Sequence, residues 1–299
     1  MSTLRSQKIP INKNKAINQI NVASAIRINY NTLSVVQQKI GDFVLQNMQS
    51  VMYLSITDLA LHCSTSETTI MRFLRKIGFT SYQVFRVNLA QSLQKDNPKY
   101  AWSDIESNDS LSTITDKIVT STITAINDIR HLITEELVSQ VVEKLVSAKR
   151  IFVFGVGSSS YIAGDLFHKL IRLGLNASTC SDSHIISIQC SQSAKDDVYI
   201  FVSHSGESDV ITNSAESVKM EGVIIVSITS YLHSTLAKLS DYTLISSTNE
   251  MKYRPDAMTS RIIQMVIIDV LTVALTIRLG KRGVDSIARS QIAVAKQKK

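Results

Sequence analysis

The second half of the chain repeats one pattern that strongly limits its fold, in which short apolar runs alternate with amphipathic helical segments. The runs are rich in β-branched and aromatic residues and occupy 151–154, 198–202, 223–228 and 242–246. Strands that are apolar on both faces must be covered on both faces, and strands that alternate with helices form parallel sheets. The pattern therefore predicts a doubly wound α/β domain over residues 147–280. Ligands of such domains bind beyond the carboxyl ends of the strands, here in the loops after 154 and 202.

The rest of the chain divides by composition into segments around this domain. A length of 299 residues is typical of two domains. Residues 17–95 place apolar residues at three- and four-residue spacing and predict an all-α domain, and residues 111–146 predict a helical connector. The polar stretch 96–110, which contains Pro98, is typical of a linker. We expect the basic ends of the chain to be a flexible arm over 1–16 and a loosely ordered tail over 281–299.

Cysteine usage and hydropathy exclude several classes of protein. Three cysteines without C-x-x-C spacing argue against a disulfide framework and a cysteine-based zinc site; they are Cys63, Cys180 and Cys190. The N-terminal residues lack the apolar core of a signal peptide. The most apolar stretch, 262–279, is interrupted by Gln264, Asp269 and Arg278. We therefore expect a cytoplasmic protein without a membrane span.

The positive charge of the chain is concentrated in its first third. Residues 1–100 contain 12 Lys and Arg and 4 Asp and Glu, a balance of +8, whereas residues 101–299 contain 20 bases and 21 acids, a balance of −1. A basic module attached to a neutral one is expected of a protein that meets a polyanion, with nucleic acid as the first candidate. A solubilising charged face would give the same balance.

Residues 55–78 show the pattern of two short helices joined by a tight turn. Ser55 followed by Asp58 is typical of a helix start, and Ser66 is placed to cap a second helix over 67–77. Gly78 is suited to end that helix in the left-handed conformation. One stripe of the second helix is apolar, formed by Ile70, Phe73, Leu74 and Ile77. The pattern predicts either a helix-turn-helix or an ordinary amphipathic hairpin in a helical domain.

The polar side of the second helix supplies the candidate DNA-binding residues. A helix-turn-helix places its second helix in the major groove, where hydroxyls approach bases and phosphates and arginines contact guanine. The predicted contact residues are Ser66, Thr68, Thr69, Arg72, Arg75 and Lys76. Ser64 departs from the usual pattern, because this turn commonly has glycine at a positive φ, and serine there costs about 1 kcal/mol. We expect double-stranded operator DNA as the partner.

Two hydroxyl-rich turns follow predicted strands in the α/β domain. The first is G-V-G-S-S-S at 155–160 and the second is S-H-S-G-E-S at 203–208. Glycines allow close backbone approach, hydroxyls donate hydrogen bonds, and helix N-termini favour anions. Two such turns favour a compact phosphate-bearing ligand over a dinucleotide, which needs a third glycine where Ser160 stands and an earlier acidic residue than Asp182. The alternative without a ligand is that these serines only cap helices.

An enzyme of the same fold is the second hypothesis for this domain. His168, His184 and His204 lie near the predicted site, and Glu207 or Glu250 could act as the base in an aldose–ketose interconversion. The chain has no H-E-x-x-H or comparable ligand spacing, so we expect no metal, no cofactor and no covalent catalysis. We expect binding without catalysis.

Two stretches of the sequence resemble known families. Residues 33–91, with S-I-T-D-L-A, S-E-T-T-I-M-R-F and R-K-I-G-F, resemble the N-terminal domain of the RpiR/MurR family of bacterial transcriptional regulators. Residues 150–280, with G-V-G-S-S and S-H-S-G-E-S, resemble the SIS (sugar isomerase) domain, and the segment after 250 resembles the same regulators. The resemblance implies a homodimer or homotetramer that senses a sugar phosphate. The ligand residues it implies are Ser158, Ser159, Ser203, Ser205, Ser208 and Glu250.

Overall fold

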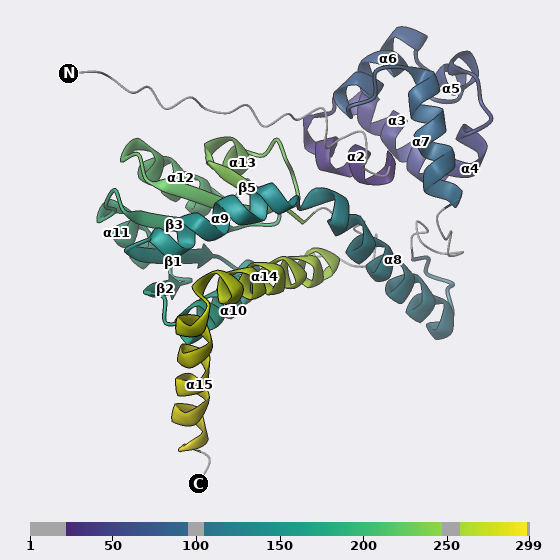
Figure 1. The fold of residues 1–299 in the computed structure, drawn as a ribbon. Coiled ribbons are helices and arrows are strands. Elements are labelled where there is room, and N and C mark those ends of the chain that lie inside the picture. The colour runs from purple at the N-terminus through teal and green to yellow at the C-terminus, as the bar shows by residue number, and fades with distance from the viewer. Residues whose placement is uncertain (1–21, 95–104, 247–257, 298–299) are drawn as a thin grey trace.

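The computed structural model describes residues 22–94, 105–246 and 258–297. The predicted arm at 1–16, the linker up to residue 104 and the candidate ligand residue Glu250 lie outside the described residues. In Figure 1 the N-terminal helices form one lobe and the sheet with its helices forms a second, with α8 lying between them.

The N-terminal lobe is all-α, as predicted. Its elements are α2 (Val22–Asn29), η1 (Tyr30–Thr32), α3 (Val35–Gln46), α4 (Met48–Val51), α5 (Ile56–His62), α6 (Glu67–Lys76) and α7 (Tyr82–Gln94). One hydrophobic core joins them, and Ile40, Phe73 and Phe85 are fully buried in it. Ser34 begins α3 with a capping box to Gln37, which satisfies two backbone groups at that helix end.

Two helices lead from this lobe to the sheet. They are α8 (Leu111–Leu132) and α9 (Glu135–Ser147), capped by the side chains of Ser110 and Thr134 respectively. The inner faces of both helices contribute to the core of the α/β domain through Ala125, Ile129, Val141 and Leu145. Leu132, at the end of α8, packs instead against the core of the N-terminal lobe.

The second lobe is the predicted doubly wound α/β domain. Its strands are β1 (Arg150–Gly155), β2 (Ala177–Cys180), β3 (Asp197–Val202), β4 (Ile224–Thr229) and β5 (Tyr242–Ile245), all parallel in the order β2-β1-β3-β4-β5. Its helices are α10 (Ser159–Arg172), α11 (Ser183–Ser191), α12 (Asp209–Met220), α13 (Thr235–Leu239) and α14 (Met258–Leu279). The order reverses at β1, so α10 lies on one face and α11, α12 and α13 on the other (Figure 1).

Alternate residues of β1, β3 and β4 supply the two layers of the core. Val153, Ile200 and Ile228 face α9, α10 and α14 in one cluster. Phe154 and Phe201 belong to the other cluster, on the side of α11 and α12. Because both faces are covered, the central strands are apolar throughout, which is the pattern that the sequence displays.

Two features of this lobe differ from the sequence predictions. Strand β2 was not predicted, because its residues are half-exposed at the sheet edge and its sequence, A-S-T-C, has no apolar run. The expectation of a loosely ordered tail was wrong, because α15 (Lys281–Ala295) is a regular helix. Ser286 of α15 lies so close to Gly174 that a Cβ at Gly174 would be 2.7 Å from the serine hydroxyl oxygen. Frequent basic residues hide this helical pattern in the sequence.

Helix α14 is long and apolar enough to cross a bilayer by length and composition, the one such helix in the described part of the chain. In the fold it packs on the sheet through Ile263, Ile267 and Leu271, which are buried. Its outer side leaves Val273 and Ile277 exposed. Core packing therefore accounts for the apolar inner face of α14.

Candidate functional site

The α5–α6 pair has the predicted helix-turn-helix geometry. Ser55 and Asp58 form a capping box at the start of α5, in which the Asp58 amide donates to the Ser55 hydroxyl at 3.1 Å. Hydrogen bonds from Ser55 lower the pKa of Asp58, so its carboxylate stays charged at the helix start. Ser64 stands in the turn with φ of 49°, the one positive φ outside glycine among the described residues. The turn therefore adopts the glycine-favouring conformation with a serine.

Helix α6 separates an apolar face from a polar one as predicted. Ile70, Phe73, Leu74 and Ile77 are fully buried, whereas the candidate DNA contacts are exposed except for half-buried Thr69. Ser66 caps α6 by accepting a hydrogen bond from the Thr69 amide at 3.2 Å. Lys76 donates to the Thr32 carbonyl oxygen, so this lysine is held against the lobe. The side chains of Thr68, Arg72 and Arg75 make no hydrogen bond or ion pair with other described residues.

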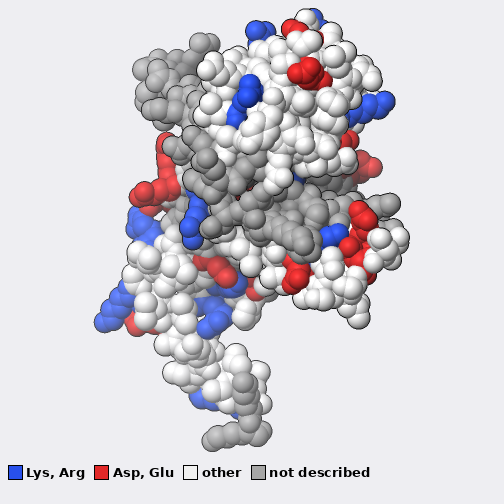
Figure 2. All heavy atoms as spheres, turned by 90° about the vertical axis from the view of Figure 1, so that its right-hand side faces the viewer, with Lys and Arg blue, Asp and Glu red and all other residues white. Residues whose placement is uncertain are grey.

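The basic charge of the N-terminal third is only partly within the described lobe. Residues 22–94 contain six Lys and Arg and three Asp and Glu, which is +3 of the total balance of +8. Figure 2 shows Lys and Arg side chains at separate points of this lobe rather than as one continuous basic surface on that face. The described lobe therefore shows no broad basic patch on that face, and the candidate DNA contacts are the exposed side chains of α6.

The two predicted phosphate loops begin side by side at the carboxyl edge of the sheet. Gly155, the last residue of β1, is in register with Val202, the last residue of β3. The loops that follow, 156–160 and 203–208, therefore leave the sheet at the same level. Because α10 and α12 then diverge to opposite faces, the loops border the crevice in which doubly wound domains bind ligands.

The first loop is tightly wound around its glycines. A Cβ at Gly155 would be 2.6 Å from the Ser159 carbonyl oxygen, and Gly157 has φ of +56°. The Ser160 hydroxyl donates to the Gly157 carbonyl at 2.7 Å and closes the turn. The hydroxyls of Ser158 and Ser159, which start α10, form no hydrogen bond with other described residues. They can therefore donate to a ligand.

The second loop keeps its hydroxyl hydrogens available as well. The buried Ser203 hydroxyl accepts from the Gly206 amide at 3.1 Å, and the Ser205 hydroxyl accepts from the Glu207 amide at 3.2 Å. A hydroxyl that accepts from an amide still has its own hydrogen to donate. Ser208 begins α12 without a side-chain capping bond, so its hydroxyl has no partner among described residues.

Two of the five candidate catalytic residues have hydrogen-bond partners in the neighbouring turn. His204 Nδ1 lies 2.9 Å from the Ser230 hydroxyl, and Glu207 Oε1 accepts from the Thr235 amide at 2.9 Å. His168 and His184 are exposed on α10 and α11. Ser230 lies in the turn after β4 and Thr235 begins α13, a segment that the sequence analysis did not identify as part of the site. The feature of the sequence that could have identified this segment is the hydroxyl-rich run T-S-Y-L-H-S-T, at the end of the strand predicted over 223–228.

A polar pocket of about 330 Å³ lies between α11 and α12, next to the second loop. Its lining includes Ser183, His184, Asp209 and Asn213 but none of the candidate ligand serines. Within the described residues no group of three His, Cys, Asp or Glu side chains is placed to hold a metal ion.

Comparison with known proteins gives the same two-part division. Residues 20–96 match the helix-turn-helix domain of the rpiR family, and residues 144–274 match the SIS domain. An HTH-type transcriptional regulator of Thermotoga maritima is 34% identical over 280 residues, covering 93% of this chain and 100% of the relative. The regulator HexR of Escherichia coli K12 is 27% identical over 277 residues, covering 92% of this chain and 94% of HexR.

A solved structure resembles nearly the whole chain. The NanR protein of Vibrio vulnificus, complexed with ManNAc-6P, superimposes with a TM-score of 0.59 and 28% identity, covering 93% of this chain and 99% of NanR. The match extends over both lobes, in the same order along the chain. Together with the helix-turn-helix and the doubly wound sheet, it places the chain in the RpiR/MurR family of HTH-type transcriptional regulators with a C-terminal SIS domain.

Proposed function

We propose that this regulator binds operator DNA through α6 and that a sugar phosphate, held between loops 156–160 and 203–208, controls that binding. The observation that supports the ligand site most directly is the in-register end of β1 and β3, from which both hydroxyl-rich loops depart. Hydroxyls, backbone amides and helix N-termini suit a phosphate dianion. The candidate ligand residues are Ser158, Ser159, Ser203, Ser205 and Ser208, with Glu250 from the segment outside the described residues.

The family and this chemistry together support the proposed ligand class. NanR was solved with ManNAc-6P, an amino-sugar phosphate. We therefore propose a phosphorylated sugar or amino sugar as effector, and a cytoplasmic repressor of the operon that degrades it. A single helix-turn-helix reads a short half-site, so a homodimer or homotetramer would supply the second half-site.

The DNA contacts are proposed from the exposed face of α6. Arg72 and Arg75 are available for guanine or phosphate contacts, while Ser66, Thr68 and Thr69 lie at the helix N-terminus, the end that approaches base edges. Lys76 bonds the Thr32 carbonyl, so it would have to leave that bond to reach a phosphate.

The hydrogen bonds that two of the candidate bases already make favour sensing over catalysis. His204 and Glu207 both have hydrogen-bond partners in the neighbouring turn, which positions them as parts of the loop structure. If the domain were an isomerase instead, the purified protein would convert its sugar phosphate over many turnovers. NMR of the sugar during prolonged incubation distinguishes stoichiometric binding from conversion.

Two experiments test the proposal. A thermal-shift screen of hexose, pentose and amino-sugar phosphates should find one that raises the melting temperature, since a ligand bound by the folded state stabilises it. Selection from a random duplex library should yield an operator whose affinity falls with salt. Arg72→Ala should weaken that operator about tenfold, whereas Arg130→Ala on α8, an exposed arginine distant in sequence, should have little effect. Absence of salt-dependent duplex binding would contradict the regulator function.

A further inference from the structure

The turn between β4 and α13, residues 229–235, is bonded along its length to the second phosphate loop. The Ser230 amide donates to the His204 carbonyl at 3.0 Å, and the Thr229 hydroxyl donates to the same oxygen at 3.1 Å. The Thr235 amide donates to the Glu207 carboxylate at 2.9 Å. We name residues 229–235 the coupling turn, because these hydrogen bonds tie them to residues 204–207.

Gly206 of the second phosphate loop packs closely against the coupling turn. Gly206 has φ of +66°, and a Cβ at this position would be 2.2 Å from the Ser234 hydroxyl oxygen. Just beyond the coupling turn, the Leu236 amide donates to the Gly206 carbonyl at 3.0 Å. A displacement of Gly206 must therefore be passed to the coupling turn, since a packed contact of this kind does not deform gradually.

The other side of the coupling turn contacts the N-terminal lobe. Leu232 packs against the hydrophobic core of that lobe. His233 Nε2 lies 2.9 Å from the Oδ1 atom of Asn29, a residue only 5% exposed at the end of α2. The Asn29 Nδ2 group donates to the Ala25 carbonyl at 2.8 Å, which fixes the amide orientation. Oδ1 can only accept, so Nε2 of His233 is the donor.

From Asn29 the hydrogen bonds continue to the DNA-reading helix. The Asn29 carbonyl accepts from the Thr32 hydroxyl at 2.7 Å, and the Thr32 carbonyl accepts from Lys76 Nζ. Lys76 is the last residue of α6. A contiguous set of contacts thus joins the second phosphate loop to the end of α6, crossing between lobes at His233.

We propose that the coupling turn transmits occupancy of the phosphate loops to α6 through the hydrogen bond of His233 to Asn29. The inference rests on the proposed phosphate site, and it adds the route by which that site acts. Phosphate drawn between Ser203 and Ser208 repositions Gly206 and the His204 carbonyl, which moves His233 and loosens its hold on Asn29. The backbone at Thr32 that holds Lys76 then changes position, which alters the placement of α6. The ligand therefore binds the arrangement before this movement and the arrangement after it with different free energies, as allosteric control requires.

The structure offers a matched control on another contact of the same lobe. The Ser24 hydroxyl in α2 donates to Asp128 of α8 at 2.6 Å. This bond also ties the N-terminal lobe to the rest of the chain, but it does not involve the coupling turn. If the route is specific, loss of the Ser24 bond will not interrupt it.

Amide hydrogen exchange of the full chain tests the route with inorganic phosphate, titrated at constant ionic strength, as the probe. In the wild type we expect phosphate to slow exchange across 203–208 and to speed exchange at Leu33, whose amide donates to the Tyr30 carbonyl, by about fivefold. That factor corresponds to about 1 kcal/mol, the size of one hydrogen bond. His233→Leu should keep the effect at 203–208 and lose the effect at Leu33. His233→Gln, which retains a donor, and Ser24→Ala should both behave like the wild type.

Each remaining outcome has a defined meaning. Protection of 203–208 without any change at Leu33 in the wild type would overturn the route and leave the phosphate site standing. A phosphate effect at Leu33 that persists in His233→Leu, or that is lost equally in Ser24→Ala, would overturn the role of His233. Absence of protection at 203–208 in the wild type would overturn both the route and the proposed phosphate site.

Discussion

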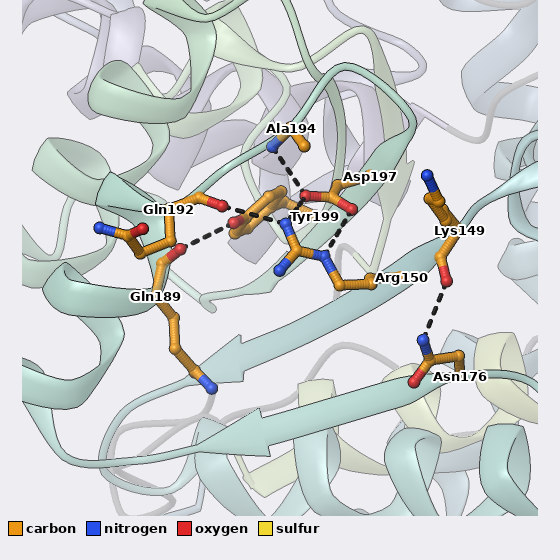
Figure 3. Close-up of polar contacts among 8 residues, drawn as sticks. All are labelled: Lys149, Arg150, Asn176, Gln189, Gln192, Ala194, Asp197 and Tyr199. Carbon is orange, nitrogen blue, oxygen red and sulfur yellow. Dashed lines mark hydrogen bonds and ion pairs between the residues drawn. The ribbon is translucent and has the colours of Figure 1, made fainter.

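The two edges of the parallel sheet are built in opposite ways from the same strands. At the amino edge, where β1 and β3 begin, Arg150 forms a two-point ion pair with Asp197 and also donates to the Gln192 carbonyl at 3.0 Å (Figure 3). The Ala194 amide donates to the same carboxylate at 2.8 Å. At the carboxyl edge, where both strands end, the hydroxyls of Ser159 and Ser208 have no partner among described residues.

Under the proposed function, this contrast assigns stability to the amino edge of the sheet and ligand binding to its carboxyl edge. A buried carboxylate whose acceptor sites are filled holds two strands together and leaves nothing for a ligand to use. Unpaired hydroxyls and glycines at positive φ contribute little to stability but are ready to donate to an anion. The amino edge should therefore lose stability when either ion-pair partner is removed, whereas the carboxyl edge should tolerate loss of its unpaired hydroxyls in the absence of ligand.

The largest expected effect is at the amino edge. Arg150→Leu leaves the Asp197 carboxylate buried without its cation, because the Asp197 side chain is 0% exposed. We expect a loss of about 3 kcal/mol in unfolding free energy, near the lower end for buried pairs because the arginine side chain is 39% exposed. Urea unfolding monitored by circular dichroism measures this loss of unfolding free energy. The affinity for sugar phosphate, measured at temperatures at which the variant is folded, should be unchanged.

Arg278→Leu is the matched control for that variant. Arg278 also makes a two-point pair, with Glu143, but both side chains are about half exposed. Solvent screening makes such pairs weak, so its loss should be much smaller than that of Arg150→Leu. Equal losses of unfolding free energy in Arg150→Leu and Arg278→Leu would show that burial of the Asp197 carboxylate does not determine how much its ion pair stabilises the protein.

The next effect is at the carboxyl edge. Ser159→Ala and Ser205→Ala each remove one hydroxyl donor to the proposed phosphate, which should cost about 1.5 to 3 kcal/mol of binding, or ten- to hundredfold in affinity. Calorimetry with the sugar phosphate from the thermal-shift screen measures the loss of affinity. The unfolding free energy without ligand should change by at most about 1 kcal/mol, the size of the bond that Ser205 accepts from the Glu207 amide. Ser187→Ala on α11 is the control, because Ser187 lines the neighbouring pocket and bonds the Ser183 carbonyl. Loss of affinity only in Ser187→Ala would move the ligand to that pocket.

The smallest effect extends the comparison to the N-terminal lobe. Ser64 has φ of 49° in the α5–α6 turn, a conformation that glycine adopts without a steric penalty. Ser64→Gly should therefore raise the unfolding free energy by about 1 kcal/mol and leave operator affinity the same. A decrease in stability would show that the serine side chain stabilises the turn in a way that outweighs the backbone strain.

The sequence predicted those features that depend on local pattern. The α6 stripe, the Ser55 cap and the Ser64 conformation follow from spacing and from the chemistry of single residues. Apolar runs predicted four of the strands. Strand β2 was not predicted, because a half-exposed strand at the side of the sheet can form without an apolar run. The contact of the coupling turn with the N-terminal lobe could not be predicted, because His233 and Asn29 are 204 positions apart in the sequence. The hydroxyl loops were found from sequence, although their roles in ligand binding stay predictions.

The most direct test of the account is a mobility-shift titration of the selected operator with the sugar phosphate, using wild type and Ser205→Ala. We predict equal operator affinity for the two proteins without ligand, because the hydrogen bonds that join the second phosphate loop to the coupling turn do not use the Ser205 side chain. The sugar phosphate should change the wild-type operator affinity, and Ser205→Ala should need ten- to hundredfold more of it for the same change. An identical dose response in the two proteins would contradict the claim that the carboxyl edge of the sheet is the sensing site.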